Sequence, residues 1–222
     1  MPSSADPVAA GSALEDGRST MTDGASSYHH GNLRTTLLAL AERKVEQVGV
    51  SGLSLRELAR EAGVSHAAPR QHFPDKQALL NALAVRGLEQ LGERLDADLE
   101  LRRRSKSFDS RLLAFARVYV SFATEHPVLL GLMFTRKEDP GAPEVRAAND
   151  RAFAAPQALI ADAWASGEIT GEDPDQVAMA VLATIQGLAA IITSGMIGDR
   201  QPDKVITAAI RTLVTGLRRT GL

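Results

Sequence analysis

The 222-residue sequence contains no cysteine. A chain without thiols forms no disulfide, holds no thiolate metal site and has no cysteine nucleophile. The motifs of several enzyme classes are also missing from the sequence, including a glycine-rich phosphate loop, a nucleophile elbow and an HExxH zinc motif. The neighbouring carboxylates Glu172 and Asp173 fall in a predicted loop, where we expect them to be solvated. These absences favour a protein that is not an enzyme and needs no cofactor over the rival class of helical enzymes.

The first 27 residues also lack the basic start and the apolar core of a signal peptide. They are rich in Ser, Ala, Gly and Asp and show no periodicity, so we predict a disordered leader over 1–27. Met21 is an alternative start of translation, which would make the preceding residues dispensable. Without a signal peptide and without cysteine, the sequence fits a cytoplasmic protein.

A net positive charge occurs in only one part of the chain. The formal net charge is −2, yet residues 28–86 carry eight basic against five acidic residues and four of the five histidines. Residues 87–222 carry 16 basic and 18 acidic residues. A modest positive surplus in the N-terminal part is what attraction to phosphates requires.

Residues 53–76, LSLRELAREAGVSHAAPRQHFPDK, carry the most informative pattern of the chain. Ser54 and Glu57 have the spacing of a capping box at the start of a first helix. Apolar residues then recur at helical spacing up to Ala62. Gly63 follows, where a helix end needs the left-handed conformation that glycine adopts at little cost.

Ser65 is predicted to cap a second helix that reaches about His72. Pro69 removes one intrahelical hydrogen bond, so we expect this helix to be short and slightly irregular. Phe73 is the expected core anchor at its end, and Lys76 begins a third helix. A helix, a glycine turn and another helix within about twenty residues form the signature of a helix-turn-helix.

These residues resemble the DNA-binding domain of the TetR family of bacterial transcription regulators, through AREAGVS and HAAPRQHFPDKQALL. YHHGNLR at 28–34 resembles the arm of one TetR subgroup, and HPVLLGLMF at 126–134 resembles the C-terminal domain of the same subgroup. One departure concerns Arg70, since the family usually has a Tyr there that contacts the DNA backbone. Arginine can also bind phosphate, with a charge, so affinity for the backbone is expected to survive.

The resemblance implies a homodimer that binds an inverted-repeat operator in double-stranded DNA. It places Ser54 and Lys76 on phosphates and Arg70 and His72 on the DNA backbone. Base-edge contacts are expected from Arg56, His66, Ala67 and Gln71. Ser65, at the start of the helix that carries His66 to His72, is also expected to contact DNA. The alternatives are structural: Ser54 caps its helix in any case, and Arg56 and Gln71 could simply be solvated. His29 and His30 have no third ligand nearby, so we predict no metal site.

The rest of the chain reads as helical. Asn32 is expected to cap a helix that runs to about Val48, with Leu33, Leu37, Leu40, Ala41 and Val48 on its buried face, and Gly49 is expected to end it. Further helices are predicted over about 76–101, 109–125, 127–134, 144–166, 175–198 and 202–219. The basic run 102–106 is interpreted as a linker, with DNA contact as the alternative. The predicted fold is all-α. It comprises a leader (1–27), a helix-turn-helix domain (28–75), a connecting helix and linker (76–106) and a helical effector-binding and dimerisation domain (107–222).

The stretch between Asp175 and Asp199 contains no charged residue. It is long enough to span a bilayer, but polar residues dilute it and neither flank is basic, so we predict no membrane association. A helix that is apolar on all sides also results when one face meets the core and another meets a partner subunit. The two terminal helices would then form a symmetric four-helix interface.

In the TetR family the C-terminal domain usually holds a small-molecule pocket. The sequence offers Tyr119, Phe122, His126, Met133, Phe134, Trp164 and Gln186 as ligand contacts. Such residues on apolar helix faces are more often plain core. Gln186 stands out because an amide within an apolar helix needs a partner, which could be a ligand, a backbone group or the same residue of a second subunit.

The favoured function is therefore a repressor released from its operator by a small molecule. Three alternatives remain open: an activator, a regulator without a ligand, and a helix-turn-helix used for protein assembly. The residues do not identify the operator, the effector or the regulated genes.

Overall fold

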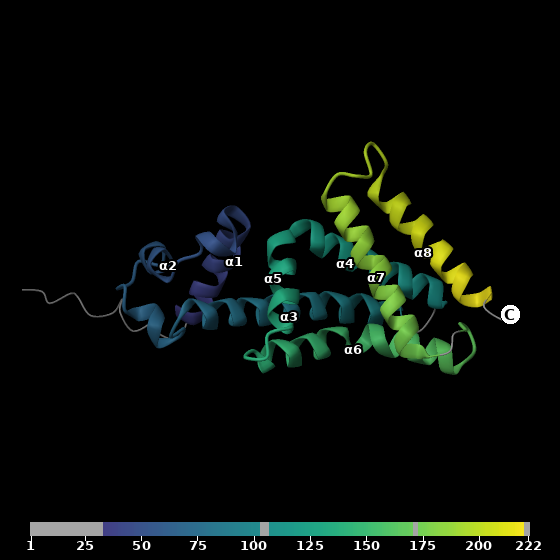
Figure 1. Cartoon of the computed structure of the whole chain (residues 1–222), viewed down its shortest axis with the longest axis horizontal. Coiled ribbons are helices and arrows are strands. Elements are labelled where there is room, and N and C mark those ends of the chain that lie inside the picture. The colour runs from purple at the N-terminus through teal and green to yellow at the C-terminus, as the bar shows by residue number, and fades with distance from the viewer. Residues whose placement is uncertain (1–32, 103–106, 171–172, 220–222) are drawn as a thin grey trace, which may run out of the picture. The chain divides into compact units, whose positions relative to one another are not determined.

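Eight α-helices and one 3-10 helix make up the described chain, and no strand occurs within residues 33–102, 107–170 and 173–219 of this computed structural model (Figure 1). The all-α prediction is confirmed. The structure describes only these three ranges, so the predicted leader, the arm with His29 and His30, the cap at Asn32 and most of the basic linker lie outside the described residues.

The first helix, α1 (Leu33–Gly52), packs its apolar stripe into the core. Its backbone leaves helical geometry at Gly49, where φ is 71°. The predicted end of the helix at this glycine corresponds to a kink, after which helical geometry resumes. The prediction that Val48 is buried is wrong, because its side chain is 45 % exposed and Val45, one turn earlier, is fully buried instead.

The second helix, α2 (Leu55–Glu61), ends as its sequence predicts. Gly63 has a φ of 68°. Its N–H donates to the Arg60 carbonyl at 3.2 Å, and the Val64 N–H donates to the Ala59 carbonyl at 3.0 Å. This pair of bonds is a Schellman motif, and Val64 packs against the core as its apolar partner.

The long helix α3 (Lys76–Arg102) links the N-terminal helices to the rest of the described chain. Figure 1 shows α1 and α2 over one end of α3, with α4 (Phe108–Glu125) and α6 (Pro143–Ala165) packed along its other end. The leucines predicted on its apolar face are all buried, namely Leu79, Leu80, Leu83, Leu88, Leu91 and Leu95. At Gly92 a Cβ atom would lie 3.0 Å from the Cα of Ala152, so glycine allows α3 and α6 to approach closely.

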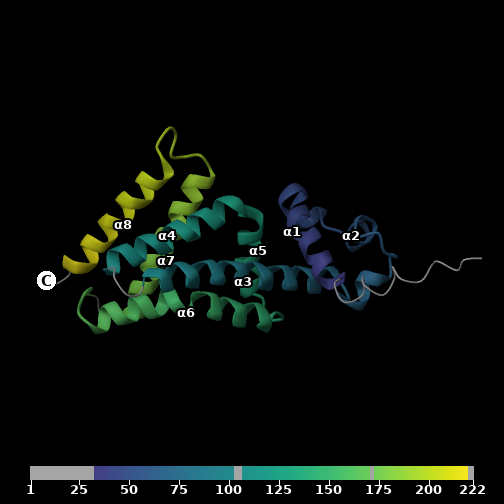
Figure 2. The same ribbon diagram turned by 180° about the vertical axis from the view of Figure 1, so that it is seen from behind.

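Three more helices complete the fold: α5 (Pro127–Lys137), α7 (Pro174–Thr193) and α8 (Pro202–Arg219). Figure 2 shows from behind that α7 and α8 lie beside α4. Two predicted boundaries are wrong. Helix α5 extends to Lys137, and α7 ends at Thr193, because Gly195 and Gly198, both with positive φ, turn the chain toward α8.

Helix α7 is the one described helix that is long and apolar enough to cross a membrane by length and composition. Within its most apolar window only 28 % of the residues are buried. Its buried face, which includes Val177, Val181 and Ile185, packs on α4, α6 and α8. Much of its apolar surface is therefore left uncovered in the single chain.

Candidate functional site

The second half of the helix-turn-helix is a short 3-10 turn and not an α-helix. Ala68–Gln71 form a 3-10 helix, η1, which corrects the predicted helix from Ser65 to His72. Pro69 is buried and has no N–H to donate, and the bonds around it are of the short type, such as Arg70 N–H to the Ala67 carbonyl at 3.1 Å. The expected irregularity is present, and it is stronger than the sequence suggested.

The predicted side-chain caps are absent. Ser54 occupies the N-cap position of α2 with extended backbone, but its side chain makes no capping hydrogen bond, so the capping box with Glu57 is not formed. Ser65 does not cap η1, whose N-cap residue is Ala67. The hydroxyls of Ser54 and Ser65 are therefore not engaged as helix caps.

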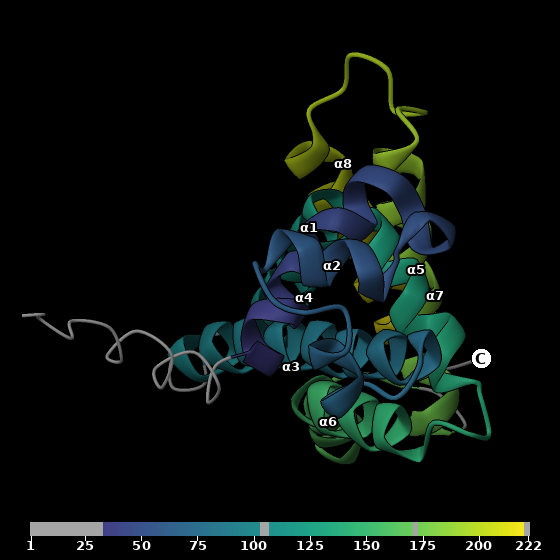
Figure 3. The same cartoon turned by 90° about the vertical axis from the view of Figure 1, so that its left-hand side faces the viewer.

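Most of the predicted DNA-contacting residues lie on exposed surface. Figure 3 shows this end of the molecule with α1 and α2 facing the viewer. The exposed residues are Arg56 of α2 together with Ser65, His66, Ala67, Arg70 and Gln71 of the turn and η1, whereas Ser54, His72 and Lys76 are partly buried. Within the described ranges, no side-chain hydrogen bond or ion pair engages Arg56, Arg70 or Gln71. These three side chains are thus free to bind an external partner.

Contacts of Phe73 and Lys76 fix the side of the turn that faces the protein interior. Phe73 is 1 % exposed, its N–H donates to the Pro69 carbonyl at 2.9 Å, and the Arg34 guanidinium lies 5.4 Å from its ring centroid. The Lys76 ammonium donates to the Ser51 carbonyl at 2.9 Å. Lys76 therefore fastens α3 to the end of α1, a structural role that the sequence did not reveal.

Two of the cavities in the described part of the chain lie among α4, α5, α6 and α7. The large cavity, of about 690 Å³, is bounded by α4, α5, α6 and α7 and includes Phe115, Phe134, Asn149, Phe153, Ile160, Met179 and Leu182. The small cavity, of about 260 Å³, lies between α4, α5 and α7 and includes Tyr119, Ala123, Leu130, Phe134, Gln186 and Ala189. Phe134 of α5 borders both cavities.

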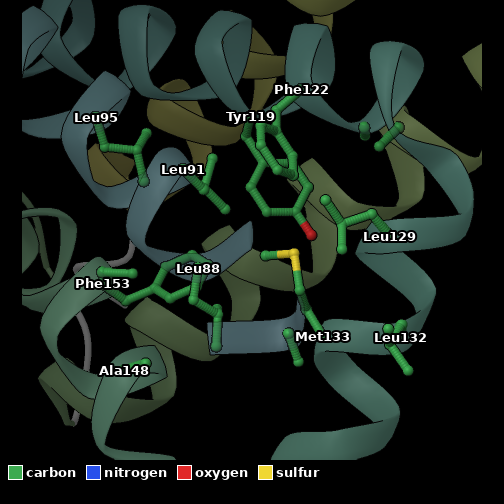
Figure 4. Packing of buried hydrophobic residues seen from close by; sticks show 14 of the residues in the cluster. Leu88, Leu91, Leu95, Tyr119, Phe122, Leu129, Leu132, Met133, Ala148 and Phe153 are labelled. Carbon is green, nitrogen blue, oxygen red and sulfur yellow. The ribbon is translucent and has the colours of Figure 1, made fainter. Parts of the chain in front are cut away.

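Three of the seven predicted ligand contacts line a cavity: Tyr119, Phe134 and Gln186. Phe122 and Met133 are fully buried core residues, as Figure 4 shows. The His126 ring lies 5.0 Å from the Phe122 ring at the start of α5, and Trp164 is 38 % exposed and borders neither cavity. Asn149 was not predicted as a ligand contact, although an amide close to the apolar residues of α6 is the same signal that singled out Gln186.

Buried polar atoms in this region lack partners. In the described part of the chain, the Tyr119 hydroxyl and Asn149 Oδ1 are buried without a hydrogen bond. Burial raises the pKa of Tyr119 to about 12, an effect that the nearby Gln186 side chain offsets in part. The hydroxyl therefore stays protonated at neutral pH and lies enclosed in the protein, close to the Gln186 side chain.

Helix α5 is attached to α1 at one end and to α3 at the other. Its N-cap residue His126 provides no side-chain cap, and the Glu46 carboxylate of α1 accepts from the N–H groups of Val128 at 3.1 Å and Leu129 at 2.9 Å instead. At the other end, the nearly buried Arg136 donates from Nε and Nη2 to Asn81 Oδ1 of α3 at 2.8 and 2.6 Å. The helix that borders both cavities is thus bonded directly to α1 and α3.

Two family descriptions match the chain. "Bacterial regulatory proteins, tetR family" matches residues 37–83, and "Tetracyclin repressor-like, C-terminal domain" matches residues 112–215. The first match contains the helix-turn-helix, and the second contains the residues that line both cavities.

Individual proteins are also similar. A protein with unknown function from Rhodococcus sp. RHA1 is 43 % identical, with a TM-score of 0.79 over 87 % of this chain and 100 % of its own. The uncharacterized HTH-type transcriptional regulator YobS of Bacillus subtilis (strain 168) is 38 % identical over 82 residues, which cover 37 % of this chain and 41 % of YobS. The transcriptional regulator FadR from Bacillus subtilis, solved in complex with stearoyl-CoA, is 15 % identical, with a TM-score of 0.65 over 82 % of this chain and 98 % of its own, and shares the fold.

The chain belongs to the tetR family of bacterial regulatory proteins. It is a transcriptional regulator, as the motifs in residues 53–76 predicted, and not an enzyme.

Proposed function

We propose that this protein is a homodimeric repressor that binds an inverted-repeat operator and is released from it by a small molecule. The observation that carries the DNA-binding part is the exposed surface formed by Arg56, Ser65–Ala67, Arg70 and Gln71, whose side chains can donate to phosphates and base edges. Ser54, His72 and Lys76 flank this surface and are proposed as phosphate or backbone contacts. A DNA-binding regulator of this family is proposed to act in the cytoplasm.

A second copy of the chain is the proposed cover for the uncovered side of α7. Met179, Ala183, Gly187 and Ala190 are exposed and recur at helical spacing on one face of that helix. Small residues in such a stripe let two helices approach closely, and a two-fold arrangement gives the same stripe to both partners. A dimer also presents two reading surfaces, as an inverted repeat requires.

The proposed route from the cavities to the DNA-binding surface runs through α5. An occupant that displaces α5 must stretch either its bonds to Glu46 or its bonds to Asn81, which belong to the helices that position the turn. Such a displacement shifts DNA affinity only if the occupant favours one position of α5 over the other. FadR, of the same fold, is known in complex with stearoyl-CoA, which supports a small-molecule effector.

Selection of DNA from a random pool by the purified full-length protein, followed by footprinting of the enriched sequence, tests this function. We expect an enriched inverted repeat with two protected half-sites about one helical turn apart or more. Failure to enrich any sequence, together with absent protection, would contradict the proposal.

Replacing Glu46 by Ala is expected to lower the free energy of unfolding by about 2 kcal/mol, because two helix N–H groups are left without their charged acceptor. The amide hydrogens of Val128 and Leu129 should exchange roughly tenfold faster, which hydrogen-exchange mass spectrometry or NMR can measure. Glu57→Ala is the matched control. Its carboxylate is 48 % exposed and makes only a long ion pair with Lys44, at 3.8 Å, which contributes little to stability. Equal effects of the two substitutions would refute the role of Glu46.

A further inference from the structure

The large cavity reaches from the core to the surface. Phe115 and Phe153 in its wall are 3 % and 7 % exposed, whereas Gln157, Asp175 and Met179, which also line it, are exposed. The cavity therefore has an apolar inner end and a rim that solvent reaches. Its volume of about 690 Å³ lies within the range of sites for drug-sized molecules, roughly 300–1,000 Å³.

The rim of this cavity carries a single kind of charge. Asp175 is the one charged residue among the described residues that line the cavity, and none of them is Lys or Arg. Within the described ranges, no basic side chain forms an ion pair or a hydrogen bond with its carboxylate. Asp175 lies in the first turn of α7, where the helix dipole also favours a carboxylate. The negative charge of the rim is thus not neutralised by another side chain.

The other polar residues of the lining are neutral. Gln157 is an exposed amide on α6. The Oδ1 atom of Asn149 is enclosed in the protein, and its Nδ2 donates to the Asp150 carboxylate at 3.4 Å. Asn149 therefore offers little to an occupant, and Asp175 decides which charge the cavity accepts.

We propose that the large cavity binds a lipophilic organic cation. Its apolar body lies against the phenylalanine rings of the inner end, and its charged group lies at the rim beside Asp175. An anionic group there would meet a like charge and no basic partner, which is unfavourable. The cation stays in contact with solvent at the rim, so it avoids the large cost of burying a charge. An aromatic ring also attracts a cation that reaches its face.

Phe134 connects the large cavity to α5. It lines the cavity, and its helix is bonded to Glu46 of α1 and to Asn81 of α3. An occupant of the cavity therefore contacts the helix through which effector control is proposed to run. This inference rests on that proposed function and names the chemical class of the effector.

Three probes with the same phenylhexyl body test the charge of the ligand: 6-phenylhexyltrimethylammonium, 6-phenylhexanol and 6-phenylhexanoate. Binding to the full-length protein is measured by calorimetry, without DNA and below the concentration at which each probe aggregates. We expect the cation to bind most tightly and the carboxylate least. The difference between them should shrink as salt rises from about 50 to 500 mM, because solvent reaches the rim and salt screens its charge. Equal affinities, tightest binding of the carboxylate, or no binding of the cation would overturn the proposal.

Asp175→Asn removes the charge and keeps the shape of the side chain. Affinity for the cation should fall roughly three- to fivefold, as expected for the loss of a partly exposed ion pair, while affinity for the alcohol is unchanged and affinity for the carboxylate rises. Asp175→Glu keeps the charge and should keep the preference for the cation. Asp162→Asn is the matched control, since Asp162 is exposed on α6 and lines neither cavity. An affinity for the cation that Asp175→Asn leaves unchanged would contradict the proposal.

Ala158→Trp tests whether the probes occupy the large cavity. Ala158 is exposed on α6 and lines that cavity but not the small one, so the indole ring enters the cavity without replacing a buried side chain. Affinity for all three probes should fall at least about tenfold, because the ring covers apolar lining that the phenylhexyl body needs. The Tm shows that the variant is folded. Unchanged affinities would place the probes elsewhere and refute the inference.

Failure of this inference can be told from failure of the proposed function. Operator binding is measured separately on the same preparations. A wild-type protein that binds its operator but does not prefer the cation refutes the ligand class alone. A protein that binds the cation through Asp175 but enriches no DNA sequence refutes the repressor function alone.

Discussion

Replacing Arg70 and Gln71 together by alanine will weaken operator binding by roughly a hundredfold or more. A good interaction of Gln71 with a base edge contributes about 1–3 kcal/mol of discrimination, Arg70 adds phosphate binding, and each interaction occurs twice in a dimer. Both side chains are exposed and have no partner within the described residues, so the double variant should keep the Tm of the wild type. Fluorescence anisotropy with the selected operator measures the change in Kd.

The two single variants separate base reading from phosphate binding. Gln71→Ala should relax sequence preference at one position of each half-site, whereas Arg70→Ala should weaken binding to all sequences and reduce the salt slope by about one for each phosphate that Arg70 neutralises. Arg146→Ala with Gln157→Ala is a matched control on the exposed surface of α6. The double variant of Arg70 and Gln71 would contradict this prediction if its affinity fell by less than about threefold. One base-edge interaction alone is expected to contribute about 1–3 kcal/mol, so such a small loss would show that this surface does not read DNA.

Replacing Phe73 by alanine will lower the free energy of unfolding by about 3–5 kcal/mol. Phe73 is 1 % exposed and ends the turn that carries the reading surface, so its removal leaves a cavity directly beneath η1. Operator binding should fall with it, because the exposed residues of the turn are then unsupported. Chemical denaturation measures the change, and Phe73→Leu is the control, expected to cost less than about 2 kcal/mol. Equal stability of Phe73→Ala and the wild type would show that the turn is held by other residues.

The sequence predicted the features that depend on local chemistry. Gly63 ended α2 in the left-handed conformation because no other residue adopts it at so little cost, and the leucines of α3 were found by their helical spacing. The capping box predicted at Ser54 is not formed. A matching pair of residue types allows such a hydrogen bond but does not require it, and the backbone hydrogen bonds of α2 form without it.

Features that depend on distant partners could not be predicted. Glu46 caps a helix 82 residues further along the chain, and nothing near Glu46 in the sequence distinguishes it from Glu42 or Glu57. The cavities are equally non-local, since Tyr119 and Gln186 become neighbours only when α4 and α7 pack. The choice between core residue and ligand-binding residue at Phe122, Met133 and Trp164 likewise depended on which face of each helix the fold covers.

A comparison of operator with scrambled DNA tests sequence-specific DNA binding most directly. The Kd of the full-length protein is measured for both duplexes at low and moderate salt. We expect a preference of at least about 10³-fold for the operator and an affinity that falls by roughly 10³ or more as salt rises from about 50 to 200 mM. Equal affinity for the two duplexes, with no dependence on salt, would contradict the assignment of Arg56, Ser65–Ala67, Arg70 and Gln71 as a DNA-reading surface.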